Sequence, residues 1–200
     1  MAVCAFCGML APALIIAHVA GNAFAGEPPK PQASEPSRIP KPPETFPLTQ
    51  FYDVPNPLPA GKPGDLIRSQ PFDEYMLPVD VSAVRILYHS VSAAGEDVAA
   101  SGVVLMPYGT PPREGWPVIA WAHPFIATSR LCAPSLMRRL HEAPVFSMYI
   151  NLGYAVVATD YVGLGTSFRN AFTDGQSNAT DVINSVIARA RPCLNSAQNG

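Results

Sequence analysis

Two apolar runs decide the fold of this chain: residues 115–125, GWPVIAWAHPF, and residues 151–166, NLGYAVVATDYVGLGT. Each run contains a Val- and Ile-rich segment of strand length, at 117–122 and 154–159, bounded by Gly or Pro. A helix-like segment connects them. The order strand, loop, helix, strand is typical of a βαβ unit in a parallel sheet, where ligands bind beyond the carboxyl ends of the strands. We therefore expect any chemistry in the two loops that follow these strands.

Further elements precede and separate these strands. Residues 83–91 and 98–106 alternate well enough for two strands, and the Gly-containing connection between them predicts a hairpin. Residues 65–69 predict a short strand or a turn. The helical segment 135–152 contains Pro144, which we expect to start a second helix, because proline is tolerated in the first helical turn.

The clearest helix of the sequence lies near its C-terminal end. We expect Ser177 or Asn178 to cap this helix, Asp181 to lie in its first turn and Pro192 to end it. Its apolar residues recur at helical spacing: Ala179, Val182, Ile183, Val186, Ile187 and Ala190. A doubly wound sheet would continue with a strand after this helix, and no strand pattern follows within the 200 residues.

The composition indicates one ordinary globular domain. The chain has 200 residues, of which 48% are apolar, so a sizeable core can be buried. The formal net charge is -2 and no basic run occurs, so we do not expect nucleic acid as a partner. The sequence does not predict an oligomeric state.

Residues 1–25 are typical of a signal peptide. An apolar run is followed by Ala23-Phe24-Ala25, an A-x-A-like cleavage site, although the usual basic residues before the run are missing. The run is interrupted by Pro12 and Gly21 and is too short for a comfortable membrane span. We favour a cleaved signal over a retained anchor, and hence a secreted, periplasmic or cell-envelope protein without a stable membrane span.

Residues 26–63 are rich in proline, and residues 64–200 are expected to form the domain. A Pro-rich segment favours polyproline II or disorder. It suits a spacer through a cell envelope, a peptide ligand, or an arm that lies partly over the domain. We favour the arm, because Phe46, Phe51 and Tyr52 supply apolar side chains that can dock.

The cysteines agree with an exported protein. Cys4 and Cys7 fall in the signal peptide and would be removed with it. Cys132 and Cys193 remain, and an even pair in an oxidising compartment allows one disulfide. The alternative is two separate buried thiols.

Five motifs in series carry a family resemblance. In chain order they are GDLIRSQPF at 64–72, RILYHSVSAAGEDVAASGVVLMP at 85–107, GWPVIAWAHP at 115–124, CAPS at 132–135 and GYAVVATDYVGLGT at 153–166. The series resembles the N-terminal half of the secretory lipase family of α/β-hydrolases. Each motif is weak alone, but their order and natural spacing make the series fairly specific, and it covers essentially all of the structured sequence.

The resemblance implies an α/β fold, namely the N-terminal part of a mostly parallel, doubly wound sheet that stops before the nucleophile strand. The intact parent would be a secreted serine lipase or esterase that hydrolyses triacylglycerol or other carboxylic esters in lipid catabolism, without a cofactor. The G-x-S-x-G elbow and the acid and His that follow it are missing, so the chain alone is expected to be an inactive fragment. Two alternatives remain: another activity on the same fold, such as a peptidase or polyester hydrolase, or a non-catalytic exported binding or envelope protein.

The first loop, His123-Pro124-Phe125, lies where this fold places its second oxyanion donor. Pro124 has no N–H, so Phe125 is the candidate donor. The resembled family has H-G here, so Pro124 departs from its pattern. For His123 we favour a structural imidazole that hydrogen-bonds its own loop over a general base, because no nucleophile is within evident reach.

The second loop contains Asp160, Tyr161, Gly163 and Gly165, which we interpret as a structural loop. The glycines allow a tight turn close to a ligand or a neighbouring segment. In the resembled family the triad acid lies later, so we expect Asp160 to pair with an N–H or with an Arg such as Arg169 rather than to act in catalysis.

Other chemistries find no support in the sequence. Residues 175–179, GQSNA, imitate an elbow, but no strand precedes them and Ala179 replaces the second glycine, so Ser177 is not expected to be a nucleophile. The G-x-G-x-x-G phosphate pattern is incomplete, because Phe168 stands at its last position. No spacing of His and Cys predicts a metal site.

Overall fold

The computed structural model describes residues 45–189. The chain divides into two compact units, Met1–Pro40 and Lys41–Gly200, and all described residues belong to the second unit. The expected signal peptide at 1–25, Pro192 and Cys193 lie outside the described residues.

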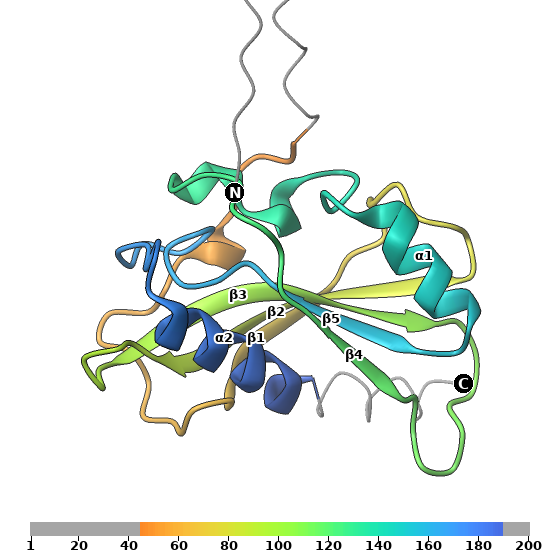
Figure 1. Ribbon diagram of the computed structural model, residues 1–200, viewed down its shortest axis with the longest axis horizontal. Helices are drawn as coiled ribbons and strands as arrows, with labels where there is room; N and C mark the ends of the chain where they lie inside the picture. The colour runs from red at the N-terminus through yellow and green to blue at the C-terminus, as the bar shows by residue number, and fades with distance from the viewer. Residues whose placement is uncertain (1–44, 190–200) are drawn as a thin grey trace, which may run out of the picture. The chain divides into compact units, whose positions relative to one another are not determined.

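A five-stranded mixed sheet forms the centre of the described unit (Figure 1). Its strands are, in chain order, β1 (Leu66–Pro71), β2 (Val81–Val91), β3 (Asp97–Pro107), β4 (Val118–Trp121) and β5 (Ala155–Thr159). They lie in the spatial order β1-β2-β3-β5-β4, so β4 forms one edge. All neighbouring pairs are antiparallel except β4 and β5, which are parallel, as the βαβ pattern predicts. The predicted strands and the hairpin between β2 and β3 are confirmed.

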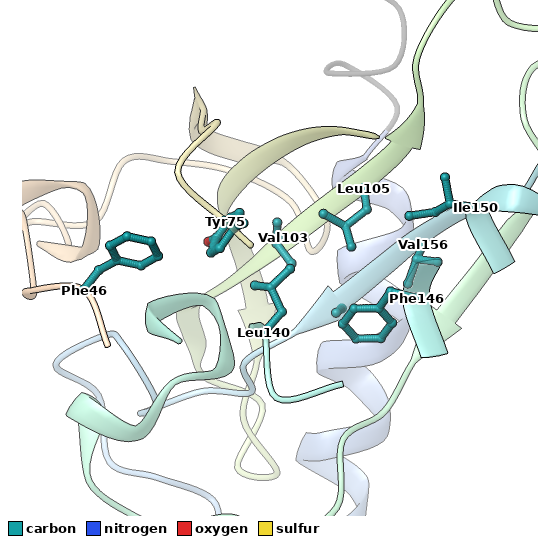
Figure 2. Packing of buried hydrophobic residues seen from close by; sticks show 9 residues of the cluster. Phe46, Tyr75, Val103, Leu105, Leu140, Phe146, Ile150 and Val156 are labelled. Atoms are coloured by element: carbon teal, nitrogen blue, oxygen red, sulfur yellow. The ribbon is translucent and has the colours of Figure 1, made fainter. Parts of the chain in front are cut away.

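The two α-helices cover opposite faces of the sheet. α1 (Ala143–Asn151) packs Phe146 against Val156 of β5, whereas α2 (Gly175–Ala188) packs Ala188 against Val157. Because successive side chains of a strand point to opposite faces, neighbouring residues of β5 contact different helices. Figure 2 shows Phe146 beside Val156 in the core under α1. Pro144 lies in the first turn of α1, as expected. Three short 3-10 helices complete the unit: Gln50–Tyr52, Arg130–Cys132 and Pro134–Leu136.

The described part of the Pro-rich segment docks on the domain. Phe46, Phe51 and Tyr52 are buried in two hydrophobic clusters that the sheet also lines. The Phe46 ring makes edge-on contacts with the rings of Phe72 and Tyr75, at centroid distances of 4.9 and 5.6 Å. From residue 45 on, the segment is therefore an arm over the domain, the alternative that its aromatic residues favoured.

Helix α2 buries polar residues and exposes apolar ones. Its buried residues are Ser177, Asp181, Asn184, Ser185 and Ala188. Ile183 and Ile187, from the apolar stripe, are 61% and 52% exposed. The buried polar face satisfies its hydrogen bonds on the sheet, where the Asn184 amide donates to the hydroxyl of Ser90 at 3.2 Å.

The start of α2 also differs from the prediction. Asp174, rather than Ser177 or Asn178, is the N-cap, and its carboxylate accepts the N–H groups of Gln176 and Ser177. The helix therefore begins about one turn earlier than expected. Asp181 consequently falls in the second turn, where its buried side chain faces the sheet instead of stabilising the helix end.

A substitution at Gly102 tests how closely β3 and β5 approach. A Cβ added at Gly102 would lie 2.5 Å from the carbonyl oxygen of Ala158 and 3.0 Å from the Cα of Thr159. Because backbone cannot yield as a side chain can, we expect Gly102→Ala to lower the free energy of unfolding by about 1–3 kcal/mol in urea denaturation. Gly175→Ala is the control, since a Cβ there meets nothing within 4 Å. Equal stabilities of the two variants would contradict the close approach.

Candidate active site

The loops after β4 and β5 meet at the carboxyl edge of the sheet. The loop after β4 leads to α1 and the loop after β5 leads to α2 on the opposite face, so the two loops diverge and leave a crevice between them. The Nε2 atom of His123 lies 3.2 Å from the carbonyl oxygen of Asp160. The hydroxyl of Tyr161 donates to the carbonyl oxygen of His123, also at 3.2 Å. The structure thus brings together the two loops that the sequence singled out.

His123 is held by its own loop and its neighbour. Its side chain is buried, with Nδ1 2.7 Å from the carbonyl oxygen of Pro124 and Nε2 facing Asp160. The ring also packs against the Tyr161 ring, at a centroid distance of 4.4 Å. Both ring nitrogens therefore face backbone carbonyls, a geometry that suits a structural imidazole and leaves neither nitrogen for a general base.

Phe125 lies at the mouth of the crevice. Within residues 45–189 its backbone N–H has no hydrogen-bond partner, and its side chain is 63% exposed. The ring packs against Phe172 at a centroid distance of 4.4 Å. An unpaired N–H at the edge of a crevice is free to bind an anionic oxygen, so the oxyanion role of Phe125 stays a prediction that this geometry permits.

A pocket of about 150 Å³ lies between the two loops and the start of α2. Apolar and polar side chains both contribute to its wall. The lining residues are His123, Phe125, Ile126, Ala127, Tyr161, Leu164, Asn170, Phe172, Thr173 and Asn178.

Asp160 lies beneath this pocket and is completely buried. Its carboxylate accepts the N–H of Ser135 at 2.8 Å, the hydroxyl of Ser101 at 2.6 Å and the hydroxyl of Ser135. Burial raises the pKa of Asp160, while these hydrogen bonds oppose the rise. The sequence predicted either a backbone N–H or an Arg such as Arg169 as the partner of this carboxylate, and the structure shows the N–H of Ser135. The carboxylate has no exposed surface from which to act on a substrate.

Ser135, the last residue of the CAPS motif, connects Asp160 to the rest of the domain. Its carbonyl oxygen accepts the hydroxyls of Tyr52 at 3.2 Å and Tyr75 at 2.7 Å, and the guanidinium of Arg85 at 3.2 Å. Sequence reasoning missed this residue and emphasised Cys132. The one available signal was Arg85, a charged residue in a strand whose neighbours are apolar.

Arg85 is almost completely buried, and no carboxylate among residues 45–189 forms an ion pair with it. Its guanidinium carbon lies 3.3 Å from the centroid of the Phe72 ring, and its Nε donates to the Tyr75 hydroxyl at 2.9 Å. Aromatic faces and hydrogen-bond acceptors thus replace the water that a charged group loses on burial. The guanidinium of Arg85 donates to the carbonyl oxygen of Ser135, whose N–H and hydroxyl donate to Asp160, so Ser135 connects Arg85 to Asp160.

The glycines after β5 allow neighbouring segments to approach. Gly163 and Gly165 have positive φ angles of 81° and 75°. A Cβ at Gly163 would lie 2.4 Å from the backbone N of Asn170, and one at Gly165 would lie 2.6 Å from the hydroxyl of Ser101. These glycines therefore allow segments of this chain itself to approach the loop closely.

Asp181 fastens α2 to the second loop and was not singled out as a site residue. Its carboxylate accepts the N–H of Val162 at 2.8 Å and the hydroxyl of Ser90. Its own carbonyl oxygen accepts the Tyr88 hydroxyl at 3.0 Å. Burial raises the pKa of Asp181 to about 6, because desolvation outweighs the two hydrogen bonds to the carboxylate.

No protein-family model and no curated protein matches the chain. Solved structures do match. The chain is 24% identical to the rice cell wall degrading esterase LipA from Xanthomonas oryzae, with a TM-score of 0.56 over 69% of this chain and 40% of that one. It is 19% identical to Candida antarctica lipase A, with a TM-score of 0.61 over 78% and 37% of the two chains. A putative hydrolase from Legionella pneumophila matches at 22% identity and a TM-score of 0.53, over 65% and 40%.

The chain has part of the α/β-hydrolase fold. At these identities the likeness shows the fold alone. The chain spans about 40% of the length of the solved structures it matches. In this hydrolase fold one oxyanion-hole N–H comes from a loop that connects a strand of the sheet to the helix after it, and the expectation for the loop at Phe125, between β4 and α1, rests on that position.

The described part of the hydrolase fold contains no cluster of three or more His, Cys, Asp or Glu side chains placed to hold a metal ion. No helix within residues 45–189 is long and apolar enough to cross a bilayer. Cys132 is half-buried and forms no disulfide with a described residue, and its proposed partner Cys193 lies outside the described residues.

The raised pKa of Asp181 predicts a pH-dependent stability. Its folded-state pKa of about 6 exceeds the ordinary value of 3.8, so the folded state keeps the proton to higher pH than the unfolded state does. The stabilisation is therefore complete below about pH 4 and is lost as pH rises through 6. We expect the free energy of unfolding to fall by about 3 kcal/mol over this range through Asp181.

The measurement is urea denaturation of the wild type and Asp181→Asn between pH 4 and 7. Asparagine keeps an oxygen for the Val162 N–H but does not titrate, so the wild type should lose stability relative to the variant as pH rises. Burial of Asp160 gives a slope of the same sign in both proteins, and the difference isolates Asp181. Parallel pH profiles of the two proteins would refute the assignment.

Proposed function

We propose that this chain is the N-terminal portion of a secreted serine ester hydrolase, a lipase or esterase that splits carboxylic esters by acyl transfer. The observation that carries the proposal is Phe125, a residue with an unpaired N–H in a loop that lines a pocket at the crevice of an α/β-hydrolase sheet. The likeness to a solved esterase and a solved lipase supports the same class of reaction. Export rests on the signal-like residues 1–25 and belongs to the same proposal.

The topology indicates where a nucleophile would enter. β4 leads through α1 on one face to β5, one step inward from the edge of the sheet. Connections between parallel strands are right-handed in about 98% of cases. Because α2 covers the opposite face from α1, a connection through α2 has to lead from β5 back in the direction of β4. A strand that follows α2 would therefore pair with the free edge of β4. In this fold the nucleophilic serine sits on the turn after that strand, beside the loop that carries Phe125.

The mechanism assigns separate parts to this chain and to the rest of the enzyme. A serine after the next strand would attack the ester carbonyl, and a later His would take its proton. The N–H of Phe125 would donate to the oxyanion that forms at the carbonyl oxygen. His123, Tyr161 and Asp160 touch no reacting atom and hold the loop in place, so they are positioning residues.

Ser177 does not supply the nucleophile. Its side chain is buried within α2, where the hydroxyl donates to the carboxylate of Asp174 at 2.8 Å and accepts the N–H of Ala93, also at 2.8 Å. A nucleophile elbow has to be an exposed turn between a strand and a helix, whereas residues 175–179 lie inside the first turns of α2, although Asp174 and not Ser177 caps the helix.

The first test is the reading frame beyond codon 200. We expect an apolar strand and a G-x-S-x-G motif within a few dozen codons, and we expect a fluorophosphonate probe to label that serine in the product of the whole frame. The 200-residue chain is the matched control and should remain unlabelled. Labelling of the 200-residue chain, or a frame without an elbow, would sink the proposal.

The second test removes the N–H of Phe125 in the product of the whole frame. Phe125→Pro deletes both the donor and the ring, whereas Phe125→Ala deletes only the ring. If the N–H binds the oxyanion, kcat of Phe125→Pro should lie about 10²–10³-fold below that of Phe125→Ala. Steady-state kinetics on a soluble ester measures the ratio, and equal kcat values would exclude the donor.

A further inference from the structure

The pocket beside Phe125 has an exposed aromatic wall. Phe125 and Phe172 remain 63% and 51% exposed although their rings contact each other at 4.4 Å. Phe125 belongs to the loop after β4, and Phe172 lies shortly before α2. Ile126 and Leu164 extend the apolar lining. Two large rings that meet at a pocket without being buried present an apolar surface to whatever enters it.

Two wall residues have an unfavourable backbone conformation. Tyr161 and Thr173 have φ angles of 65° and 71°, in the left-handed region, and both line the pocket. For a β-branched residue such as Thr173 this conformation is a genuine outlier that costs about 1–3 kcal/mol. Such strain persists only where the surroundings enforce it, and it concentrates at binding and catalytic sites. Leu140 and His141 share this conformation without lining the pocket, so the strained wall accompanies the exposed rings and does not by itself mark a ligand site.

The volume limits what can be bound. The pocket measures about 150 Å³, the size of an engineered protein cavity that accepts benzene. Its capacity is therefore about six carbon atoms. A long fatty acyl chain would extend beyond the described wall.

We propose that this pocket binds the acyl group of the ester substrate, up to about six carbon atoms, with the ester carbonyl at the N–H of Phe125. The proposal rests on the proposed function and narrows its substrate class to short-chain esters. Phe172 packs against the ring of Phe125 from the oxyanion loop on the wall of the pocket, and it is the specificity-determining residue. Ala127 lines the same pocket, where a larger side chain would occupy the space of the acyl group.

The experiment uses ketones that imitate ethyl esters but cannot be hydrolysed. The ¹⁵N-labelled 200-residue chain is titrated with 4-heptanone, 4-nonanone and 4-undecanone, which replace the ester oxygen of ethyl butanoate, hexanoate and octanoate by a methylene. Amide chemical shifts report both the site and the Kd. We expect saturable shifts at Phe125, Ile126 and Leu164, a Kd that falls about fourfold per added methylene up to 4-nonanone, and no further gain for 4-undecanone.

Variants separate the pocket from general hydrophobic binding. Phe172→Ala should weaken binding of 4-nonanone at least about fivefold, because one apolar wall is lost. Ala127→Leu should abolish binding by filling the pocket. Tyr108→Ala is the control, since Tyr108 is 77% exposed and does not line the pocket. Amide spectra of each variant, recorded without ketone, verify that the fold is retained.

Each outcome decides the matter. Shifts that do not saturate, a Kd that continues to fall for 4-undecanone, or a Phe172→Ala variant that binds like the wild type would overturn the proposal. The titration needs no nucleophile, so its result is separate from the proposed function. If the ketones bind but no serine of the whole reading frame reacts with the fluorophosphonate, the acyl pocket stands and the proposed hydrolase function fails. If a serine is labelled but the ketones do not bind, the hydrolase function stands and the acyl pocket fails.

Discussion

The junction between Ser135 and Asp160 is the interaction on which the rest of this structure depends. The buried carboxylate accepts hydrogen bonds from one N–H and two hydroxyls, and the carbonyl of Ser135 accepts hydrogen bonds from the buried Arg85 and from two tyrosines. The arm, the segment before β2, the middle of the sheet and the end of β5 thus converge on one residue. Removal of any partner would leave a charge or polar group buried without compensation, which costs several times the net contribution of a satisfied hydrogen bond.

The candidate site follows from this junction because the two site loops leave the sheet next to it. Asp160 ends β5, and its carbonyl oxygen faces His123 in the loop after β4. Asp181 fastens the continuation of the second loop to α2 through the N–H of Val162. Buried carboxylates therefore hold the start of the second loop at Asp160 and Val162, while the first loop keeps unpaired donors, among them the N–H of Phe125. Rigid supports around an exposed donor are the arrangement that electrostatic stabilisation of an oxyanion requires.

Sequence reasoning singled out the two loops of the candidate site but missed some of the residues that support them. The two loops were recognised because Val-rich strands of a βαβ unit end at the same edge of the sheet, and the structure brings them together. Sequence reasoning emphasised Cys132 and missed Ser135, because the role of Ser135 lies in its backbone carbonyl. A carbonyl that accepts three hydrogen bonds cannot be recognised from the type of residue that carries it. Asp181 was interpreted as a helix-end charge, because its partners Ser90 and Val162 lie far from it along the chain.

What the sequence determined by itself is local: the strands, the hairpin, the parallel β4–β5 pair and the proline at the start of α1 all follow from short-range hydrophobic periodicity and backbone chemistry. Only the tertiary structure decided which face of α2 is buried. Its isoleucines form a clear apolar stripe, yet the polar face lies on the sheet because Asp181 and Asn184 both hydrogen-bond the hydroxyl of Ser90 in β2. Hydrogen bonds between residues distant along the chain outweigh the tendency of the apolar stripe to be buried. These partners are too far apart in the sequence for a local pattern to reveal them.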